Sequence, residues 1–156
     1  SILLYLFVFT ISVSLVFFAE RCTYILSHKG NNINMLGKVL IVISIFILCV
    51  FAALRSPSVG IDVSIYVTPN WNQNYSQDFL TYYENMMVPT EIGFAFILYI
   101  GLLLDNLGIT FFIIQFLIIF PIYVVLIRYR EKLSMPLGLA VYLFLFYNIS
   151  FFFKVP

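Results

Sequence analysis

The sequence predicts an all-α membrane protein, a polytopic helix bundle with about five transmembrane helices and one long extracytoplasmic connector. Of its 156 residues, 63% are hydrophobic and only 10% are charged, whereas a soluble domain typically has about 25% charged residues. Apolar runs alternate with polar segments, and each run is expected to be helical because backbone groups must find partners within lipid. The net charge of +1 offers no excess of basic residues for a nucleic acid, so we expect no nucleic-acid partner.

Five apolar runs approach the length of about 20 residues that crosses the hydrocarbon core. They lie at about Ile2–Ala19, 36 or 39 to Leu54, Ile92–Leu104, Ile109–Ile127 and Pro136–Phe153. The third run is short, and the turn residues at 105–108 join it to the fourth as a helical hairpin. We expect residues 1–156 to be a single multi-pass membrane domain and the N-terminal part of a longer protein.

Residues 55–91 form the long connector between the second and third runs. The segment holds four carboxylates and Trp71, the only tryptophan of the chain. Its tyrosines and tryptophan favour the membrane–water interface, so part of it is expected to lie flat on the membrane. We expect function to reside in this connector.

Basic residues give two answers about orientation, because cytoplasmic loops are enriched in Lys and Arg. The segment 20–38 has three basic residues and one acid, which favours the cytoplasm and places the connector 55–91 outside. Five full spans would then place the basic segment 128–134 outside as well, against the rule. A re-entrant hairpin formed by the third and fourth runs would remove the conflict.

The stretch 55–66 is the strongest candidate site. Arg55 ends the second run, Pro57 stops the helix, and Gly60 permits a bend that brings Asp62 towards Arg55. A planar guanidinium matches a phosphate or pyrophosphate. The alternative is an arginine that snorkels from the end of a span before an ordinary turn, and spacing alone leaves both open.

Other candidates also have both functional and structural interpretations. Asp62 is either a general base, a helix N-cap or the partner of Arg55. Glu91 is either a base or a first-turn acid that stabilises a helix dipole. Four aromatic residues either stack on sugars or anchor the connector at the interface, and these are Trp71, Tyr75, Tyr82 and Tyr83.

Few residues elsewhere suggest chemistry. Cys22 and Cys49 share no metal-ligand spacing and are interpreted as structural, and His28 as a solvated side chain. We expect no metal and no cofactor, and no glycine-rich phosphate loop is present. Polar residues inside the runs are expected to hydrogen-bond across helices, namely Ser12, Ser14, Ser44 and Gln115.

The run 52–66, with Glu91 and Gly93 at the head of the next span, resembles the EpsG family of bacterial membrane proteins, grouped with Wzy-type polysaccharide polymerases. The shared pattern is an apolar span that ends in arginine, a Gly-x-Asp element, a tyrosine four residues on, and a glutamate that opens an apolar helix. Here those residues are Arg55, Gly60, Asp62, Tyr66 and Glu91. Ile61 replaces the usual threonine, and residues 147–156 lack the Asn-x-x-Arg-Gln element of that family.

The resemblance implies a glycosyltransferase of the bacterial cell (cytoplasmic) membrane that polymerises exopolysaccharide, capsule or O-antigen. Its substrate would be a polyprenyl-pyrophosphate-linked oligosaccharide, and its partners the lipid bilayer and polysaccharide chain-length or export proteins. Arg55 would stabilise the departing pyrophosphate, and Asp62 or Glu91 would accept the proton of the acceptor hydroxyl. Substrate-binding residues would be Arg55, Gly60, Tyr66 and Trp71.

Two other classes of function remain. A transporter or flippase would fit several spans and a re-entrant hairpin near Asp105, but transporters place ionisable residues within their spans, and here nearly all lie at span ends. A non-catalytic assembly component of polysaccharide biosynthesis is the other alternative.

Overall fold

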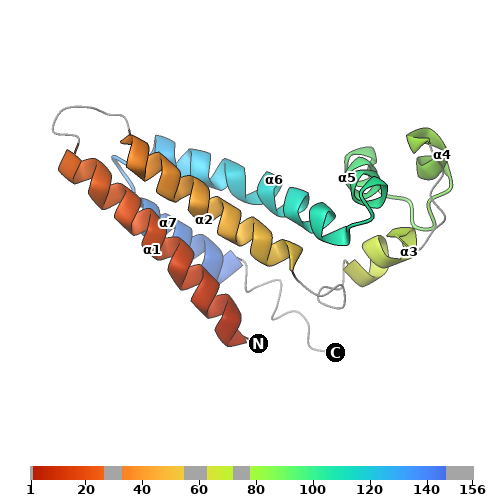
Figure 1. Cartoon of the computed structure of the whole chain (residues 1–156), viewed down its shortest axis with the longest axis horizontal. Coiled ribbons are helices and arrows are strands. Elements are labelled where there is room, and N and C mark those ends of the chain that lie inside the picture. Colours follow the sequence, from red (N-terminus) through yellow and green to blue (C-terminus); the bar gives the residue numbers. More distant parts are fainter. Residues whose placement is uncertain (1, 27–32, 55–62, 72–77, 147–156) are drawn as a thin grey trace.

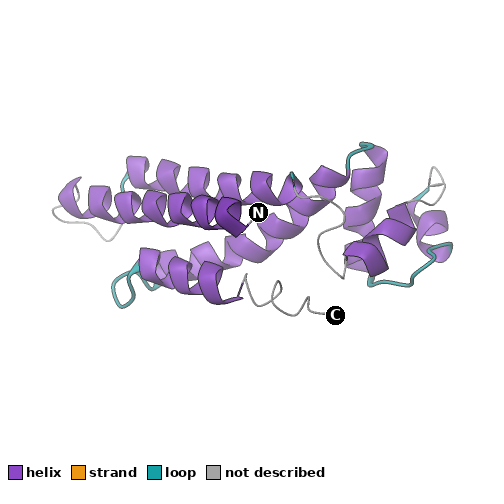
Figure 2. Cartoon of the chain, turned by 90° about the horizontal axis from the view of Figure 1, so that it is seen from below, coloured by secondary structure: helices purple, strands orange, loops and turns teal. Residues whose placement is uncertain are grey.

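The structure is a computed structural model that describes residues 2–26, 33–54, 63–71 and 78–146. Every regular element in these ranges is helical, and none is a strand, so the all-α class is confirmed (Figures 1 and 2). In order, the elements are α1 (Ile2–Leu26), α2 (Met35–Ala53), η1 (Val63–Val67), α3 (Thr68–Trp71), α4 (Phe79–Glu84), α5 (Ile92–Leu103), α6 (Leu107–Arg128), α7 (Met135–Val141) and η2 (Tyr142–Phe146).

Three of the helices, α1, α2 and α6, are long and apolar enough to cross a membrane. They correspond to the first, second and fourth predicted spans. The third predicted span is α5, which has 12 residues and is about 18 Å long. The fifth begins as the apolar helical stretch Met135–Leu145, which is also shorter than a span. The described residues therefore support a membrane protein with three helices of spanning length.

The bundle consists of α1, α2, α6 and α7 packed side by side (Figures 1 and 2). Its core is apolar and is built from one face of each helix, as the burial of Phe9, Leu48, Ile119 and Leu139 shows. The opposite faces of α1, α2 and α6 expose large apolar side chains. Such a surface suits lipid, where backbone polar groups are satisfied within each helix.

A buried hydrogen-bond chain ties three helices of the bundle together. The Ser44 hydroxyl of α2 donates to the Ser12 carbonyl of α1 at 3.0 Å and lies 2.6 Å from the Tyr123 hydroxyl of α6. A serine hydroxyl has one hydrogen, so Tyr123 is the donor to Ser44. The prediction that Ser44 bonds across helices is confirmed. Gln115 is also buried in α6, whereas Ser14 is exposed.

A second, smaller unit lies at one end of the bundle. We call residues 63–71 and 78–103 the end unit, which contains η1, α3, α4 and α5. Its own apolar core includes Val67, Tyr82 and Leu98. Figure 1 shows α5 end-on while α6 runs along the long axis, and Figure 2 shows α5 turned across it. Thus α5 lies across the end of α6 rather than alongside it.

Two features join the end unit to α6. Gly101 of α5 lies so close to Thr110 of α6 that a Cβ at position 101 would clash with the threonine hydroxyl. The intervening turn has Asp105 at φ 47°, a left-handed conformation that Asp and Asn tolerate better than most residues. The Asn106 side chain then accepts from the Gly108 amide at 2.9 Å and caps α6. A turn at Asp105 and Asn106 is confirmed, but Leu107 and Gly108, which were expected in the turn, already belong to α6.

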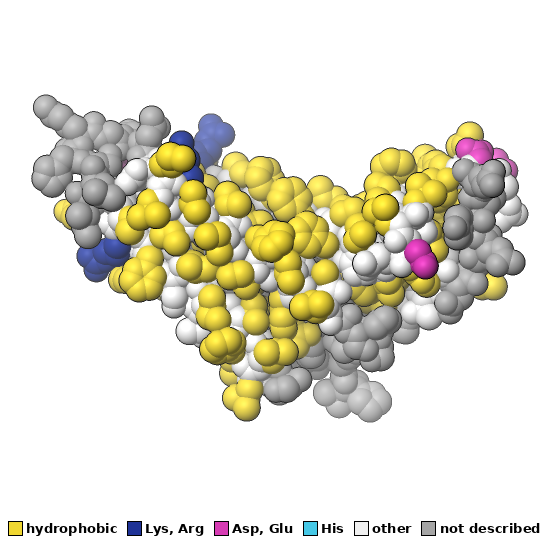
Figure 3. All heavy atoms as spheres, in the orientation of Figure 1, with side chains coloured by type: hydrophobic (Ala, Val, Ile, Leu, Met, Phe, Trp, Pro, Cys, Tyr) yellow, Lys and Arg dark blue, Asp and Glu magenta, His cyan; other side chains and the backbone are white. Residues whose placement is uncertain are grey.

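Charged side chains separate to the two ends of the molecule (Figure 3). The C-terminal end of α1, the start of α2 and the end of α6 lie together and carry all the basic residues that the structure describes, namely Arg21, Lys38, Arg128, Arg130 and Lys132. The Glu20 carboxylate of α1 accepts a hydrogen bond from the Met135 amide at 3.4 Å, so the start of α7 also lies at this basic end. Four of the six described acids lie at the opposite end, namely Asp78, Glu84, Glu91 and Asp105.

This separation resolves the conflict about orientation. Five full spans would place the segment 128–134 opposite the segment 20–38. In the structure the described residues of both segments lie at one end, because α5 does not run the length of the bundle (Figure 1). A single orientation therefore satisfies the rule for basic residues at both segments.

The hydrogen-bond chain through Ser44 yields a stability prediction. Ser44→Ala leaves the Tyr123 hydroxyl buried without its acceptor, and we expect the free energy of unfolding to fall by about 1 kcal/mol. Ser14→Ala, at an exposed position of α1, is the matched control and should change little. Unfolding of the purified protein in mixed detergent micelles measures both. Equal stabilities for the two variants would contradict the role of Ser44.

Candidate functional site

The candidate site residues fall into two groups. Arg55, Gly60 and Asp62 lie outside the described residues. Tyr66, Trp71 and Glu91 belong to the end unit or its boundary segments and can be placed. Their positions decide which of the sequence-based roles has structural support.

Trp71 is half-buried and packs between helices. A Cβ built at Gly101 would lie 3.1 Å from Cζ3 of the indole ring, beside the contact of Gly101 with Thr110. The ring therefore fills the space where α3, α5 and α6 meet. This position assigns Trp71 a packing role in the end unit.

Glu91 is exposed at the head of α5. It is the N-cap residue, but its carboxylate makes no capping hydrogen bond. Its main-chain carbonyl accepts from the Ala95 amide at 2.9 Å, the first turn of the helix. The carboxylate stands at the N-terminal end of the helix, where the helix dipole attracts a negative charge.

The structure does not bring Trp71 and Glu91 together. Trp71 contacts Gly101, close to the end of α5, whereas Glu91 precedes its first residue. The ten positions between Glu91 and Gly101 correspond to about 15 Å of helix. A single small ligand group could not contact both side chains at once.

Tyr66 lies in the π-helical turn η1, and 41% of its surface is exposed. Its main-chain carbonyl accepts from the Asn70 side chain at 2.9 Å. The backbone of Tyr66 is therefore held in place while its ring remains accessible. Among the candidate site residues that the structure describes, Tyr66 and Glu91 are exposed and Trp71 is half-buried.

Asn70 is the residue on which the geometry of the end unit depends, and sequence analysis gave it no role. It is completely buried. Its Nδ2 donates to the carbonyls of Tyr66 and Val88, at 2.9 and 3.0 Å, and its Oδ1 accepts from the Val88 amide at 3.0 Å. We call these three bonds the Asn70 clamp. They fix the backbone three residues before Glu91.

No local pattern in the sequence announces the Asn70 clamp. The segment around Asn70 has many polar amides, and 18 residues separate it from Val88. A buried asparagine on a short helix must find partners for its amide, because an unpaired polar group in an apolar core is costly. The Tyr66 carbonyl is a local partner, but only the packing of α3 against segment 86–90 supplies the two partners at Val88.

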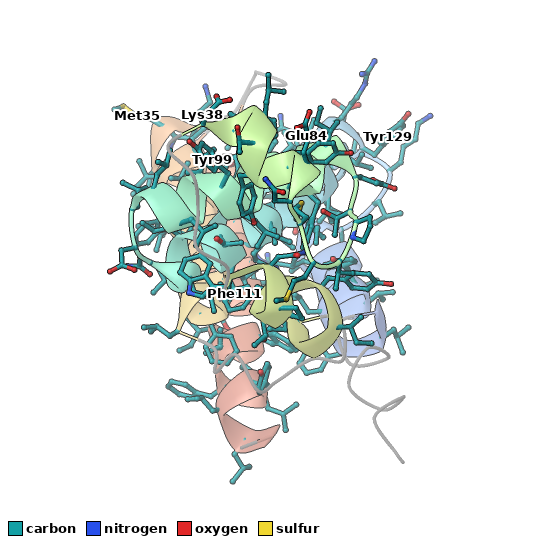
Figure 4. The ribbon with its side chains drawn as sticks, turned by 90° about the vertical axis from the view of Figure 1, so that its right-hand side faces the viewer. Met35, Lys38, Glu84, Tyr99, Phe111 and Tyr129 are labelled. Carbon is teal, nitrogen blue, oxygen red and sulfur yellow. The ribbon has the colours of Figure 1, made fainter. Side chains whose placement is uncertain are left out.

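The connector aromatics pack against one another rather than projecting outwards. Tyr82 lies 5.5 Å from Tyr99, ring centre to ring centre, and Phe79 lies 5.5 Å from both Phe96 and Tyr99. Tyr82 is only 2% exposed. Figure 4 faces the end unit, with Tyr99 directed into it and Glu84 at its edge. These contacts favour a structural role for Tyr82 over stacking on a sugar.

The Tyr82 hydroxyl is buried and has no hydrogen-bond partner among the described residues. Burial raises the pKa of Tyr82 to about 12, because a phenolate would lose its hydration there. Tyr83, by contrast, is half-buried and its hydroxyl donates to the Thr90 carbonyl at 3.4 Å. The two neighbouring tyrosines thus differ in both burial and bonding.

Metal-binding side chains do not gather within the described ranges, where no three His, Cys, Asp or Glu residues could hold a common ion. Cys22 and Cys49 are both free, and Cys49 is completely buried. His28 lies outside the described residues. In the described part of the end unit, the groups available for chemistry are the exposed carboxylates and the phenol of Tyr66.

No protein-family model, curated protein or solved structure matches this chain. Function is therefore inferred from the residues of the connector, from their resemblance to the EpsG pattern and from the geometry of the end unit.

The Asn70 clamp can be tested by hydrogen exchange. Asn70→Leu keeps the approximate volume but leaves the Val88 amide and carbonyl without partners, and we expect local stability to fall by about 2 kcal/mol. That loss corresponds to roughly 30-fold faster exchange of the Val88 amide. Asn85→Leu is the control, since Asn85 is exposed and bonds only its own helix at Thr81. Unchanged protection at Val88 would refute the clamp.

Burial of Tyr82 gives a pH prediction. Its pKa is raised from 10.0 to about 12, so the stabilising effect of the neutral phenol is present below about pH 10 and is lost as the pH rises through about 12. Tyr82→Phe should therefore reduce the fall in melting temperature over that range, with Tyr83→Phe as control. The same alkaline fall in the Tyr82→Phe variant and the unaltered protein would contradict this assignment.

Proposed function

We propose that this protein is a polysaccharide polymerase-like glycosyltransferase of the bacterial cytoplasmic membrane. It is a multi-pass protein whose end unit lies at the outer face and whose basic end lies in the cytoplasm. Its substrate is a polyprenyl-pyrophosphate-linked oligosaccharide, and it forms exopolysaccharide, capsule or O-antigen. The observation that carries the proposal is Glu91, an exposed carboxylate at the acidic end of the bundle, three residues after the segment that the Asn70 clamp holds at Val88.

The reaction divides into two tasks for this chain. The bond between the sugar C1 and the pyrophosphate oxygen breaks, and the Arg55 guanidinium stabilises the negative charge of the leaving group. The acceptor hydroxyl attacks C1 and gives its proton to a carboxylate, either Asp62 or Glu91. The lipid carrier already activates the donor sugar, so the transfer needs no nucleotide.

Substrate binding is assigned to residues that a ligand can reach. Tyr66 has an accessible ring, and its position next to the Asn70 clamp supports contact with a sugar. Gly60 would allow close approach of the backbone to the pyrophosphate. Trp71, which packs against Gly101, acts by positioning the end unit. Polysaccharide chain-length or export proteins would meet the protein on the same outer face.

Single substitutions that either remove or keep the charge of each residue test this proposal in the host bacterium. We expect Arg55→Lys, Asp62→Asn or Glu91→Gln to shorten the surface polysaccharide while membrane insertion stays normal. Loss of the true base should reduce polymerisation by about 10²-fold or more. Glu84→Gln is the matched control, because Glu84 is an exposed acid of the same unit outside the EpsG-like pattern. Normal polymer length in all three variants would overturn the enzymatic proposal.

A non-catalytic assembly component is the second candidate, and the packing of the end unit favours it. Trp71 and Tyr82 make protein contacts, which suits a unit built to present a surface. In that case Asn70→Leu would impair polymer formation, while Glu91→Gln would not. A transporter has less support, because the charged residues within the described ranges lie at the two ends of the bundle rather than along its interior (Figure 3).

A further inference from the structure

Helix α5 has an apolar face that the described part of the protein leaves largely exposed. Ile92, Phe96 and Leu103 are 61%, 52% and 55% exposed and follow one another at helical spacing along one stripe. The opposite face is buried by α4 and α6 through Ala95 and Leu98. A helix that is apolar on all sides belongs in a protein core or in lipid. One side of α5 is in a protein core, and the other requires lipid or a partner.

The length and direction of α5 exclude a full crossing. At 12 residues it measures about 18 Å, against about 30 Å of hydrocarbon. It also lies across the end of α6, which is itself long enough to span (Figures 1 and 2). If α6 crosses the membrane, α5 runs along the membrane plane near one surface.

The charged residues at either end of α5 indicate that both ends of the helix lie at the same depth in the membrane. Glu91 immediately precedes the helix and Asp105 follows it within two residues, and both are exposed. An unpaired carboxylate is costly inside the hydrocarbon region, so both ends must reach water or headgroups. Glu84 of the same end unit is exposed as well. These three acids therefore mark one water boundary.

We propose that α5 is an interfacial helix embedded in the outer boundary of the bilayer, with lipid acyl chains covering Ile92, Phe96 and Leu103. The connector and both ends of α5 then lie on one side of the membrane, and the chain crosses next through α6. This assignment does not depend on the reaction that the protein catalyses.

Lipid fits this face better than a protein partner does. The exposed stripe of α5 contains no charged residue, and Leu80 and Met87 of the end unit are also exposed apolar side chains. Figure 3 shows hydrophobic side chains over the end unit as well as over the bundle. Because the apolar surface of the bundle already requires lipid, lipid can also cover the exposed face of α5, and no separate protein interface is needed.

Labelling of single cysteines tests the sidedness in intact cells, with Cys22→Ser as background and the fully buried Cys49 retained. Asn85→Cys and Asn106→Cys flank α5, and Ser134→Cys lies at the basic end. Asn106 is used instead of Asp105 because position 105 has a left-handed backbone. We expect a membrane-impermeant maleimide to label both flanking sites from outside and Ser134→Cys only after permeabilisation. Opposite sidedness for the two flanking sites would overturn the proposal.

Nitroxide labels in the protein reconstituted into vesicles measure depth. In Phe96→Cys and Leu103→Cys, accessibility to oxygen and to a water-soluble nickel complex should place both labels at similar, shallow depths. A label at Phe46, an exposed position in the middle of α2, provides the deep reference. For a helix along the membrane normal, positions 96 and 103 would differ by about 10 Å in depth.

The same labels would also reveal a protein, rather than lipid, on the exposed face of α5. A second copy or a protein partner on α5 would immobilise both labels and reduce their contact with oxygen and with nickel alike, which would overturn the assignment to lipid. Labels accessible mainly to nickel would place the stripe in water and would overturn it equally.

Discussion

The arrangement of the helices in this protein depends on the separation of its charged residues into two groups at opposite ends of a long apolar bundle. Ionisable groups are costly inside hydrocarbon, so each must reach an aqueous surface. Arg21 and Arg128 lie at one end of the bundle, while Glu91 and Asp105 lie at the other. The helices between them must then satisfy their own backbone hydrogen bonds.

The crosswise position of α5 follows from that constraint. A third helix parallel to α2 and α6 would have carried the chain back to the basic end and reversed the sidedness of segment 128–134. Instead, Gly101 lets α5 pack tightly across Thr110, and the left-handed Asp105 turns the chain directly into α6. One small residue and one unusual backbone angle thus keep both basic segments at one end.

Within the end unit, the buried side-chain amide of Asn70 fixes the backbone that leads to the exposed Glu91. The Asn70 clamp joins α3 to the backbone at Val88, and this fixes the entry of the chain into α5 at Glu91. The aromatic rings of Tyr82 and Tyr99 complete the core beneath. The polar bonds specify the geometry, while the aromatic contacts supply the apolar burial that a unit of this size needs.

The sequence by itself determined the helical class, the membrane environment and the approximate limits of α2 and α6, because these follow from apolar run length and from backbone hydrogen bonding in lipid. It placed the start of α1 but ended that helix at Ala19, whereas α1 continues through Glu20 and Arg21 to Leu26. It also located the Asp105 turn, whose chemistry is local. It could not place Trp71 in a helix contact or find the Asn70 clamp, because both depend on residues distant in the chain. The direction of α5 was likewise decided only by tertiary packing, since a short apolar run does not by itself show whether its helix enters the bilayer as half of a re-entrant hairpin or lies along the surface.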